Sequence, residues 1–323
     1  MGVLFLVLLS IGSSIDSGLQ NLFIVTFVVG TAAIGWNVIG GFGGQFSLGN
    51  GVFFGLTSYT IGLLMVTVNL SFVPALLIGL GVTLLAAVVI GLPSFKLTGH
   101  YFALATITVV AGGRYLVRYF DATTGGAQGF SLVPASVGGG LALNLTTMGY
   151  YYVALALFAF AVLVSIRLRY SKLGYYRLAL KDDQEAASAI GINVPRYKMY
   201  GWLVTAFLTG LAGAVYTIYT QYLVPSYMFS ISQSVLYAVI PIIGGIGTLL
   251  GPIVGTFVLV PVQTFAVSEF GGNFGALTYV VYGVLLILLI LYAPDGIVSR
   301  TGAIGERLVT TIGRGHDDRG SEE

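Results

Sequence analysis

The chain has no cysteine, few histidines and few charged residues. Without cysteine it can form no disulfide and no thiolate metal site, and its two histidines, His100 and His316, are far apart in sequence. Only 8% of its 323 residues are charged, whereas soluble proteins carry about 25%. Together with a hydrophobic fraction of 56% and a mean hydropathy of +0.94, this scarcity of charge indicates an integral membrane protein.

The sequence also lacks the short motifs of common enzymes. It contains neither the paired histidines of a zinc protease nor a Gly-x-Ser-x-Gly elbow. The lysines at positions 96, 172, 181 and 198 follow Phe, Ser, Leu and Tyr, so the Gly-Lys-Ser/Thr end of a phosphate-binding loop cannot form. We therefore expect no enzyme activity and no cofactor in this chain, and any nucleotide hydrolysis must come from another chain.

Long apolar runs follow one another along most of the chain. Runs such as ALTYVVYGVLLILLILYA are apolar on every face, whereas strands of a membrane barrel alternate polar and apolar residues. The sequence predicts an all-α, polytopic transmembrane helical bundle of 8–10 spans, with glycine-rich broken or re-entrant segments. The predicted spans cover residues 20–39, 46–68, 72–92, 100–119, 148–166, 200–222, 233–250, 252–268 and 276–293, after a short first helix.

The basic residues give an orientation. Half of the lysines and arginines fall within residues 167–198, and four arginines lie after Tyr292. By the positive-inside rule both segments are predicted to be cytoplasmic. We expect one transmembrane domain over residues 1–323 in the cell membrane, with a cytoplasmic loop at 167–198 and a cytoplasmic tail at 300–323.

Two glycine-rich stretches interrupt the apolar pattern. The first is GGFGGQFSLGNGVFFGLTSY, from Gly40 to Tyr59, and the second is IGGIGTLLGPIVGT, from Ile243 to Thr256. Such interruptions mark substrate routes in transporters, although close packing of helices through small residues would give a similar composition. The polar residues inside the first stretch favour a route. The predicted pathway residues are Gly44, Gln45, Ser47, Gly49, Asn50, Gly244, Gly245 and Gly247.

The basic loop reads RLRYSKLGYYRLALKDDQEAASAIGINVPRYK. Its pattern predicts a short helix with Asp182 as N-cap and Glu185 completing a capping box. Gly191 fits the position after the C-cap, and Pro195 is expected to prevent continuation of the helix. From these residues alone the helix could dock on a partner or simply connect two spans.

Seven passages, in order, carry a resemblance to a known family. They are GGFGGQFSLGNGVFFGLTSYT, LTGHYFALATIT, TGGAQGF, LGYYRLALKDDQEAASAIGINVPRYK, FLTGLAGAVY, IGGIGTLLGPIVGT and APDGI. The chain resembles the permease subunits of ABC importers for branched-chain amino acids, the Liv type, and is more similar to the M-type than to the H-type subunit. The resemblance runs over nearly the whole chain.

The resemblance implies a set of partners. They are a second permease subunit of the H type, two ATP-binding subunits, an extracytoplasmic substrate-binding protein and the lipid bilayer, with no nucleic acid. It also implies that the basic loop docks on the ATP-binding subunits. The matching positions are Asp182, Asp183, Glu185, Ala186, Ala187, Gly191 and Asn193.

Other functions stay open at this point. Importers of urea or short-chain amides use very similar permeases, so the resemblance also allows urea or a short-chain amide as the substrate. A stand-alone channel or secondary transporter would usually need ionisable residues inside its spans, and the predicted span interiors hold no Asp or Glu apart from Glu269 at an edge. A membrane scaffold would leave the capped basic loop unexplained.

Overall fold

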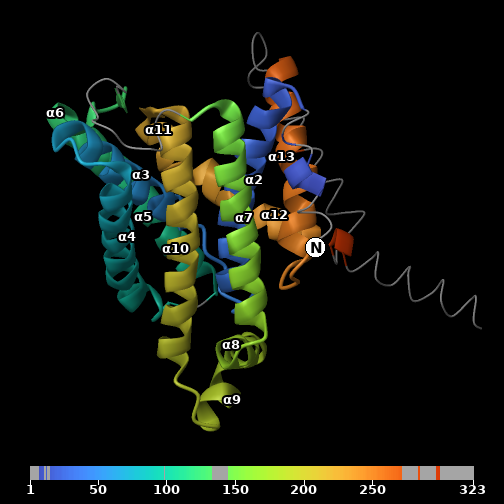
Figure 1. Cartoon of the computed structure of the whole chain (residues 1–323). Helices are drawn as coiled ribbons and strands as arrows, with labels where there is room; N and C mark the ends of the chain where they lie inside the picture. Colours follow the sequence, from blue (N-terminus) through green and yellow to red (C-terminus); the bar gives the residue numbers. More distant parts are fainter. Residues whose placement is uncertain are drawn as a thin grey trace, which may run out of the picture.

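The computed structural model describes residues 7–10, 12, 15–97, 99–132, 145–270, 283 and 296–298. Its long helices lie side by side in one bundle (Figure 1). They are α2 (Ser17–Asn37), α3 (Asn50–Thr67), α4 (Phe72–Ser94), α5 (Gly99–Tyr119), α7 (Thr147–Arg169), α10 (Val194–Thr220), α12 (Ile231–Gly245) and α13 (Gly251–Phe270). The prediction of an all-α bundle is confirmed.

Shorter elements lie at the ends of the long helices. They are the π-helix η1 (Val38–Phe42), α6 (Asp121–Thr124), α8 (Lys172–Asp182), α9 (Gln184–Ala189), α11 (Pro225–Met228), and the strands β1 (Phe130–Ser131) and β2 (Tyr222–Leu223). The two strands pair antiparallel, with Phe130 opposite Leu223. Figure 1 shows α8 and α9 at one end of the bundle and α6 and α11 at the other.

Six helical segments of the described chain are long and apolar enough to cross a membrane. They are Ser17–Phe42, Asn50–Thr67, Phe72–Ser94, Thr147–Arg169, Val194–Thr220 and Pro225–Gly245. The predicted spans 100–119 and 252–268 are also helical, as α5 and α13. The predicted span 276–293 lies, apart from Gly283, outside the described residues, and so does most of the predicted short first helix.

Helix α10 lies in the core and packs on α2, α3 and α4. Trp202 of α10 is fully buried, and its ring centroid lies 4.9 Å from that of Phe53 in α3. Small residues let the backbones come close: a Cβ added at Gly35 of α2 would stand 3.2 Å from Cβ of Leu208. In a lipid bilayer the hydrophobic effect does not drive helices together, and close packing through small residues contributes to their association instead.

The outer face of α4 is apolar and exposed. Val73, Leu77, Leu85, Val89 and Leu92 are each more than 60% exposed. On a soluble protein such a continuous apolar face would be an aggregation hazard. On a membrane-spanning bundle such a face is suited to contact with lipid hydrocarbon.

Candidate functional site

The first glycine-rich stretch is a true break between two spans. Helix α2 runs into η1, residues 43–49 are not helical, and α3 begins only at Asn50. The predicted span 46–68 therefore begins four residues too early. Gly44 has φ +66°, a left-handed conformation that suits glycine and that ends the helical path.

The backbone of this break is held by buried side chains from three helices. The indole Nε1 of Trp36 donates to the carbonyl of Ser47 at 2.5 Å. The N–H of Leu48 donates to Thr106 Oγ1 at 3.0 Å, and the N–H of Gly51 donates to Ser234 Oγ at 2.8 Å. Non-helical backbone at membrane depth is tolerated when it is bonded inside the protein in this way.

The polar residues predicted for the pathway lie in this break and are buried. Ser47 and Asn50 have no exposed surface, and Gln45 is 7% exposed. Asn50 Nδ2 donates to Thr209 Oγ1 at 3.4 Å, and Ser47 Oγ accepts from the N–H of Gly49 at 3.1 Å. Within the described residues, Gln45 Oε1 and Asn50 Oδ1 are buried acceptors without a hydrogen-bond partner. A buried acceptor without a partner destabilises the protein by about 1–3 kcal/mol. A ligand that donates a hydrogen bond to Gln45 Oε1 or Asn50 Oδ1 would remove this cost.

The second glycine-rich stretch forms the turn between α12 and α13. Gly245 and Gly247 have φ +129° and +75°, which L side chains rarely adopt. Gly244 has another role, because a Cβ at this position would overlap the carbonyl oxygen of Gly251. The structure therefore places Gly244 at a close helix–helix contact, Gly245 at the last position of α12 and Gly247 in the turn.

Asn37, at the end of α2, joins the two breaks. It is fully buried, its Oδ1 accepts from the N–H of Gly247 at 3.0 Å, and its Nδ2 donates to the carbonyl of Thr248 at 2.9 Å. One amide side chain thus satisfies a donor and an acceptor of the second break. Asn37 was not among the predicted site residues, because a single Asn at the end of an apolar run gives no signal of a partner some 210 residues away.

Arg177 of α8 reaches the same region. It is 1% exposed, and its Nη2 donates to the carbonyl of Val38 at 2.6 Å. Its guanidinium lies against Gly43 and Gly201, where a Cβ would overlap it. Burial lowers the pKa of Arg177 to about 9, so the side chain still carries its charge at neutral pH. That charge lies at the carbonyl end of α2 and η1, where a cation is favoured.

Lys181, one turn further along α8, contacts both breaks. A Cβ added at Gly44 would stand 3.0 Å from Lys181 Cγ, and one added at Gly247 would stand 3.3 Å from its Nζ. Two residues predicted from separate passages, Gly44 and Gly247, therefore meet at α8. The sequence pattern of the basic loop predicted one short helix and did not predict α8.

The capping of α9 differs from the prediction by one residue. Asp182 is the last residue of α8, and Asp183 is the N-cap of α9, with Oδ1 accepting from the N–H groups of Glu185 and Ala186 at 2.8 and 3.0 Å. Glu185 is consequently the second residue of the helix, one place short of the position in a capping box. Asp182 was the wrong choice because only Asp183 has the extended backbone of an N-cap, φ −154° and ψ 117°.

The end of α9 follows the prediction at Gly191 but not at Pro195. Gly191 has φ +89°; its N–H donates to the carbonyl of Ser188, and that of Ile192 donates to Ala187, both within 3.1 Å. This is the Schellman arrangement. Pro195 does not stop this helix: it lies in the first turn of α10, whose N-cap is Asn193. Proline suits that turn because its missing N–H has no helical partner there.

Helix α9 projects from the bundle (Figure 1). Of the positions predicted to dock on the ATP-binding subunits, Ala187 is 3% exposed and anchors the helix. The others are exposed: Asp182, Asp183, Glu185, Ala186, Gly191 and Asn193. A short helix with both ends capped and most of its surface free is suited to docking.

We expect Asp183→Ala to destabilise α9 by about 1 kcal/mol, because two N–H groups lose their acceptor. The matched control is Asp183→Asn, which removes the charge but keeps a good N-cap. Amide hydrogen exchange at residues 184–189 measures the effect. Equal exchange in both variants would show that the cap does not hold this helix.

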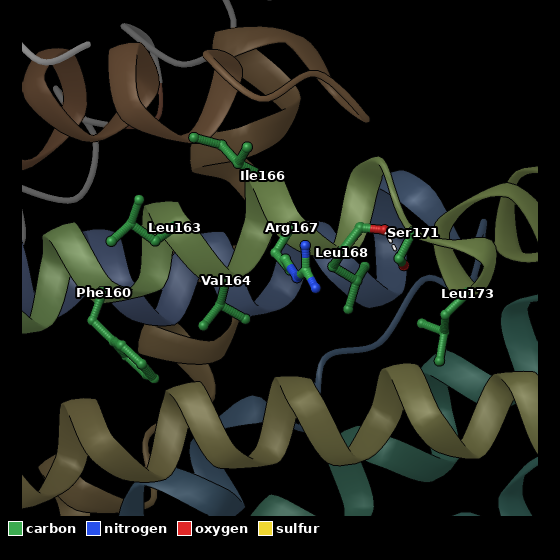
Figure 2. A pocket seen from close by; sticks show the side chains of 8 residues that line it. All are labelled: Phe160, Leu163, Val164, Ile166, Arg167, Leu168, Ser171 and Leu173. Carbon is green, nitrogen blue, oxygen red and sulfur yellow. Dashed lines mark hydrogen bonds between the residues drawn. The ribbon is translucent and has the colours of Figure 1, made fainter.

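Pockets also lie on the surface near α8. One, of 670 Å³, lies at the corner between α7 and α8, and Figure 2 shows its apolar side chains. Its lining residues are Phe160, Leu163, Val164, Ile166, Arg167, Leu168, Ser171 and Leu173. None of the predicted site residues is among them. A second pocket, of 590 Å³, is bordered by Gly247 and Thr248 of the second break and by Arg169 and Tyr175.

Comparisons with known proteins agree with this architecture. Residues 18–290 match the family described as branched-chain amino acid transport system / permease component. The chain is 25% identical to the high-affinity branched-chain amino acid transport system permease protein LivM of Salmonella typhimurium and to that of Escherichia coli, over 89% of this chain and 71% of each relative. It is 27% identical to LivH of Salmonella typhimurium over 42% of this chain and 43% of that protein. No solved structure matches the chain. The chain belongs to the family of branched-chain amino acid transport permeases, and it is a multi-pass membrane protein.

Proposed function

We propose that this chain is the membrane-spanning subunit of an ATP-driven importer for branched-chain, aliphatic amino acids. The observation that carries the proposal is the continuous connection from the exposed helix α9, through α8, to both glycine-rich breaks. A docking helix attached to a broken region of a bundle is the arrangement that a separate motor protein needs. Relatives of both the M and the H type match the chain, which supports pairing with a second permease subunit.

The proposed complex contains this chain, an H-type permease, two ATP-binding subunits and an extracytoplasmic binding protein. Helices α8 and α9 and the C-terminus face the cytoplasm, as the excess of basic residues in 167–198 favours. This subunit itself needs no cofactor and performs no catalysis, and ATP is used by its partners. Nucleic acid has no part in the complex.

The proposed route passes the first break. The unpaired acceptors Gln45 Oε1 and Asn50 Oδ1 are suited to the ammonium group of an amino acid. The N-terminus of α3, which begins at Asn50, favours a carboxylate. Buried apolar residues such as Val52 and Phe53 follow directly and suit an aliphatic side chain. Gly44, Gly49, Gly245 and Gly247 let the backbone come close to the substrate, while Gly244 keeps α12 against α13.

Reconstitution in lipid vesicles tests the proposal. The full complex is expected to accumulate labelled leucine when ATP and loaded binding protein are present, and this chain alone is expected to neither hydrolyse ATP nor accumulate leucine. The reason is that the chain offers a path but no phosphate-binding loop. Leucine accumulation by this chain alone in a proton or sodium gradient would overturn the proposal. ATP-dependent uptake of urea in place of leucine would keep the mechanism and correct the substrate.

A further inference from the structure

Arg177 is a buried cation that links α8 to the first break. Helix α8 ends at Asp182 and α9 begins at Gln184, so one residue separates the exposed helix from the anchored one. Arg177 lies on the face of α8 that packs on η1 and α10. Its bond to the carbonyl of Val38 is short, at 2.6 Å. A displacement of α9 can therefore reach the break through the Arg177 side chain, beside the contact of Lys181 with Gly44.

The guanidinium has almost no freedom to move by itself. A Cβ on Gly201 of α10 would overlap Nη1, and a Cβ on Gly43 would overlap Nη2. Two glycines thus leave room for the guanidinium and for nothing more. Because protein interiors transmit displacement when they are close-packed, movement of α8 presses the guanidinium against η1 and α10.

Arg177 is also incompletely bonded. Its Nε and Nη1 are buried and have no hydrogen-bond partner among the described residues, and burial is the only cause acting on its pKa. A buried cation without an anion is costly, and an apolar residue in its place is commonly neutral or stabilising. Arg177 is therefore not expected to stabilise the folded protein, and its role must be sought elsewhere.

A competing bond shows what a small movement would change. The carbonyl of Ile39 accepts from the N–H of Gln45 at 3.1 Å, and Arg177 Nη2 lies 3.5 Å from the same oxygen, at the limit of a hydrogen bond. If α8 shifts toward η1, Arg177 strengthens its bond to Ile39 and weakens that of Gln45. Gln45 is a proposed pathway residue.

We infer that Arg177 is a positioning residue that transmits the displacement of α8 and α9 to the first break, by competing with the N–H of Gln45 for the carbonyl of Ile39. The inference rests on the proposed function, because it requires a motor that moves α9. In this scheme α9 provides the docking surface, and movement of α8 changes the conformation of residues 43–49.

The test compares transport with ATP hydrolysis in the reconstituted complex. In Arg177→Met, ATP hydrolysis stimulated by loaded binding protein is expected to stay near the wild-type rate, because α9 still docks. The amount of leucine transported per ATP is expected to fall about tenfold, which corresponds to losing one charge-assisted hydrogen bond. The variant should be at least as stable to heat as the wild type. Arg177→Lys keeps the cation and should restore part of the transport.

A second pair of variants displaces the guanidinium without removing it. Gly201→Ala puts a methyl group where Nη1 lies and is expected to uncouple transport as Arg177→Met does. Its matched control is Gly81→Ala in α4, where a Cβ meets nothing within 4 Å. A further measurement is hydrogen exchange at residues 43–49, which should respond to ATP in the wild type but not in Arg177→Met.

The outcomes separate the inference from the proposed function. If the wild-type complex transports and Arg177→Met moves as much leucine per ATP, the inference is wrong and the proposed function stands. If transport, hydrolysis and heat stability all fall together, Arg177 has only a structural role and the inference is again wrong. If the wild-type complex itself shows no ATP-dependent transport, the proposed function fails, and the inference fails with it.

Discussion

Asn37→Leu is expected to lower the free energy of unfolding by about 3 kcal/mol and to abolish transport, because the N–H of Gly247 and the carbonyl of Thr248 lose their partner in a buried site. Leucine has as many side-chain heavy atoms as asparagine and the same branching at Cγ, so the loss of two hydrogen bonds dominates over the change in packing. The two breaks would then no longer be tied together where α8 contacts both. Thermal unfolding in detergent and leucine uptake by the reconstituted complex measure the two effects.

The matched control for this prediction is Thr31→Val in the same helix. Thr31 is also fully buried, but its hydroxyl donates to the carbonyl of Phe27 within its own helix, at 2.9 Å. Removing it leaves no buried group without a partner, so we expect little change in either measurement. An unfolding midpoint of Asn37→Leu equal to that of Thr31→Val would show that the bonds to the second break add no stability.

Gly244→Ala is expected to have the second-largest effect, a destabilisation of about 1–3 kcal/mol with loss of folded protein. The added methyl group would overlap the carbonyl oxygen of Gly251, a backbone atom that no rotamer change can move aside. Gly244 lies within α12, so alanine fits its backbone conformation, and the effect comes from the contact alone. Thermal unfolding and the yield of inserted protein measure it.

This variant also distinguishes packing from a place in the substrate route. Gly81→Ala serves as the control, because alanine on an exposed helix face is neutral or slightly stabilising. If Gly244→Ala keeps its heat stability but loses transport, Gly244 belongs to the route and not to a helix contact. If neither property changes, the close approach of α12 and α13 is not needed.

The fold class and the two breaks could be predicted from the sequence because both depend on composition within a short window. A run of about 20 apolar residues can satisfy its backbone in lipid only as a helix. Glycines and polar residues inside such a run disfavour a continuous helix. For the same reason Gly191 could be placed after the C-cap of α9, where its φ is +89°.

Local patterns were less reliable where two neighbouring residues share one chemistry. Asp182 and Asp183 can both cap a helix, and only the backbone conformation decided for Asp183. Pro195 is compatible with the end of one helix and with the first turn of the next. The sequence shows the residue type in each case, but the path of the chain between α8, α9 and α10 selects its role.

The sequence by itself determined that this protein is a helical membrane bundle with two breaks and a capped basic loop, since each property follows from residues close together in the chain. Only the tertiary structure decided that the two breaks meet. Asn37 bonds to Gly247 and Thr248, and Arg177 reaches the carbonyl of Val38, across separations of more than 130 residues. A hydrogen bond over such a distance in sequence leaves no periodicity or local motif, because it depends on how the helices pack.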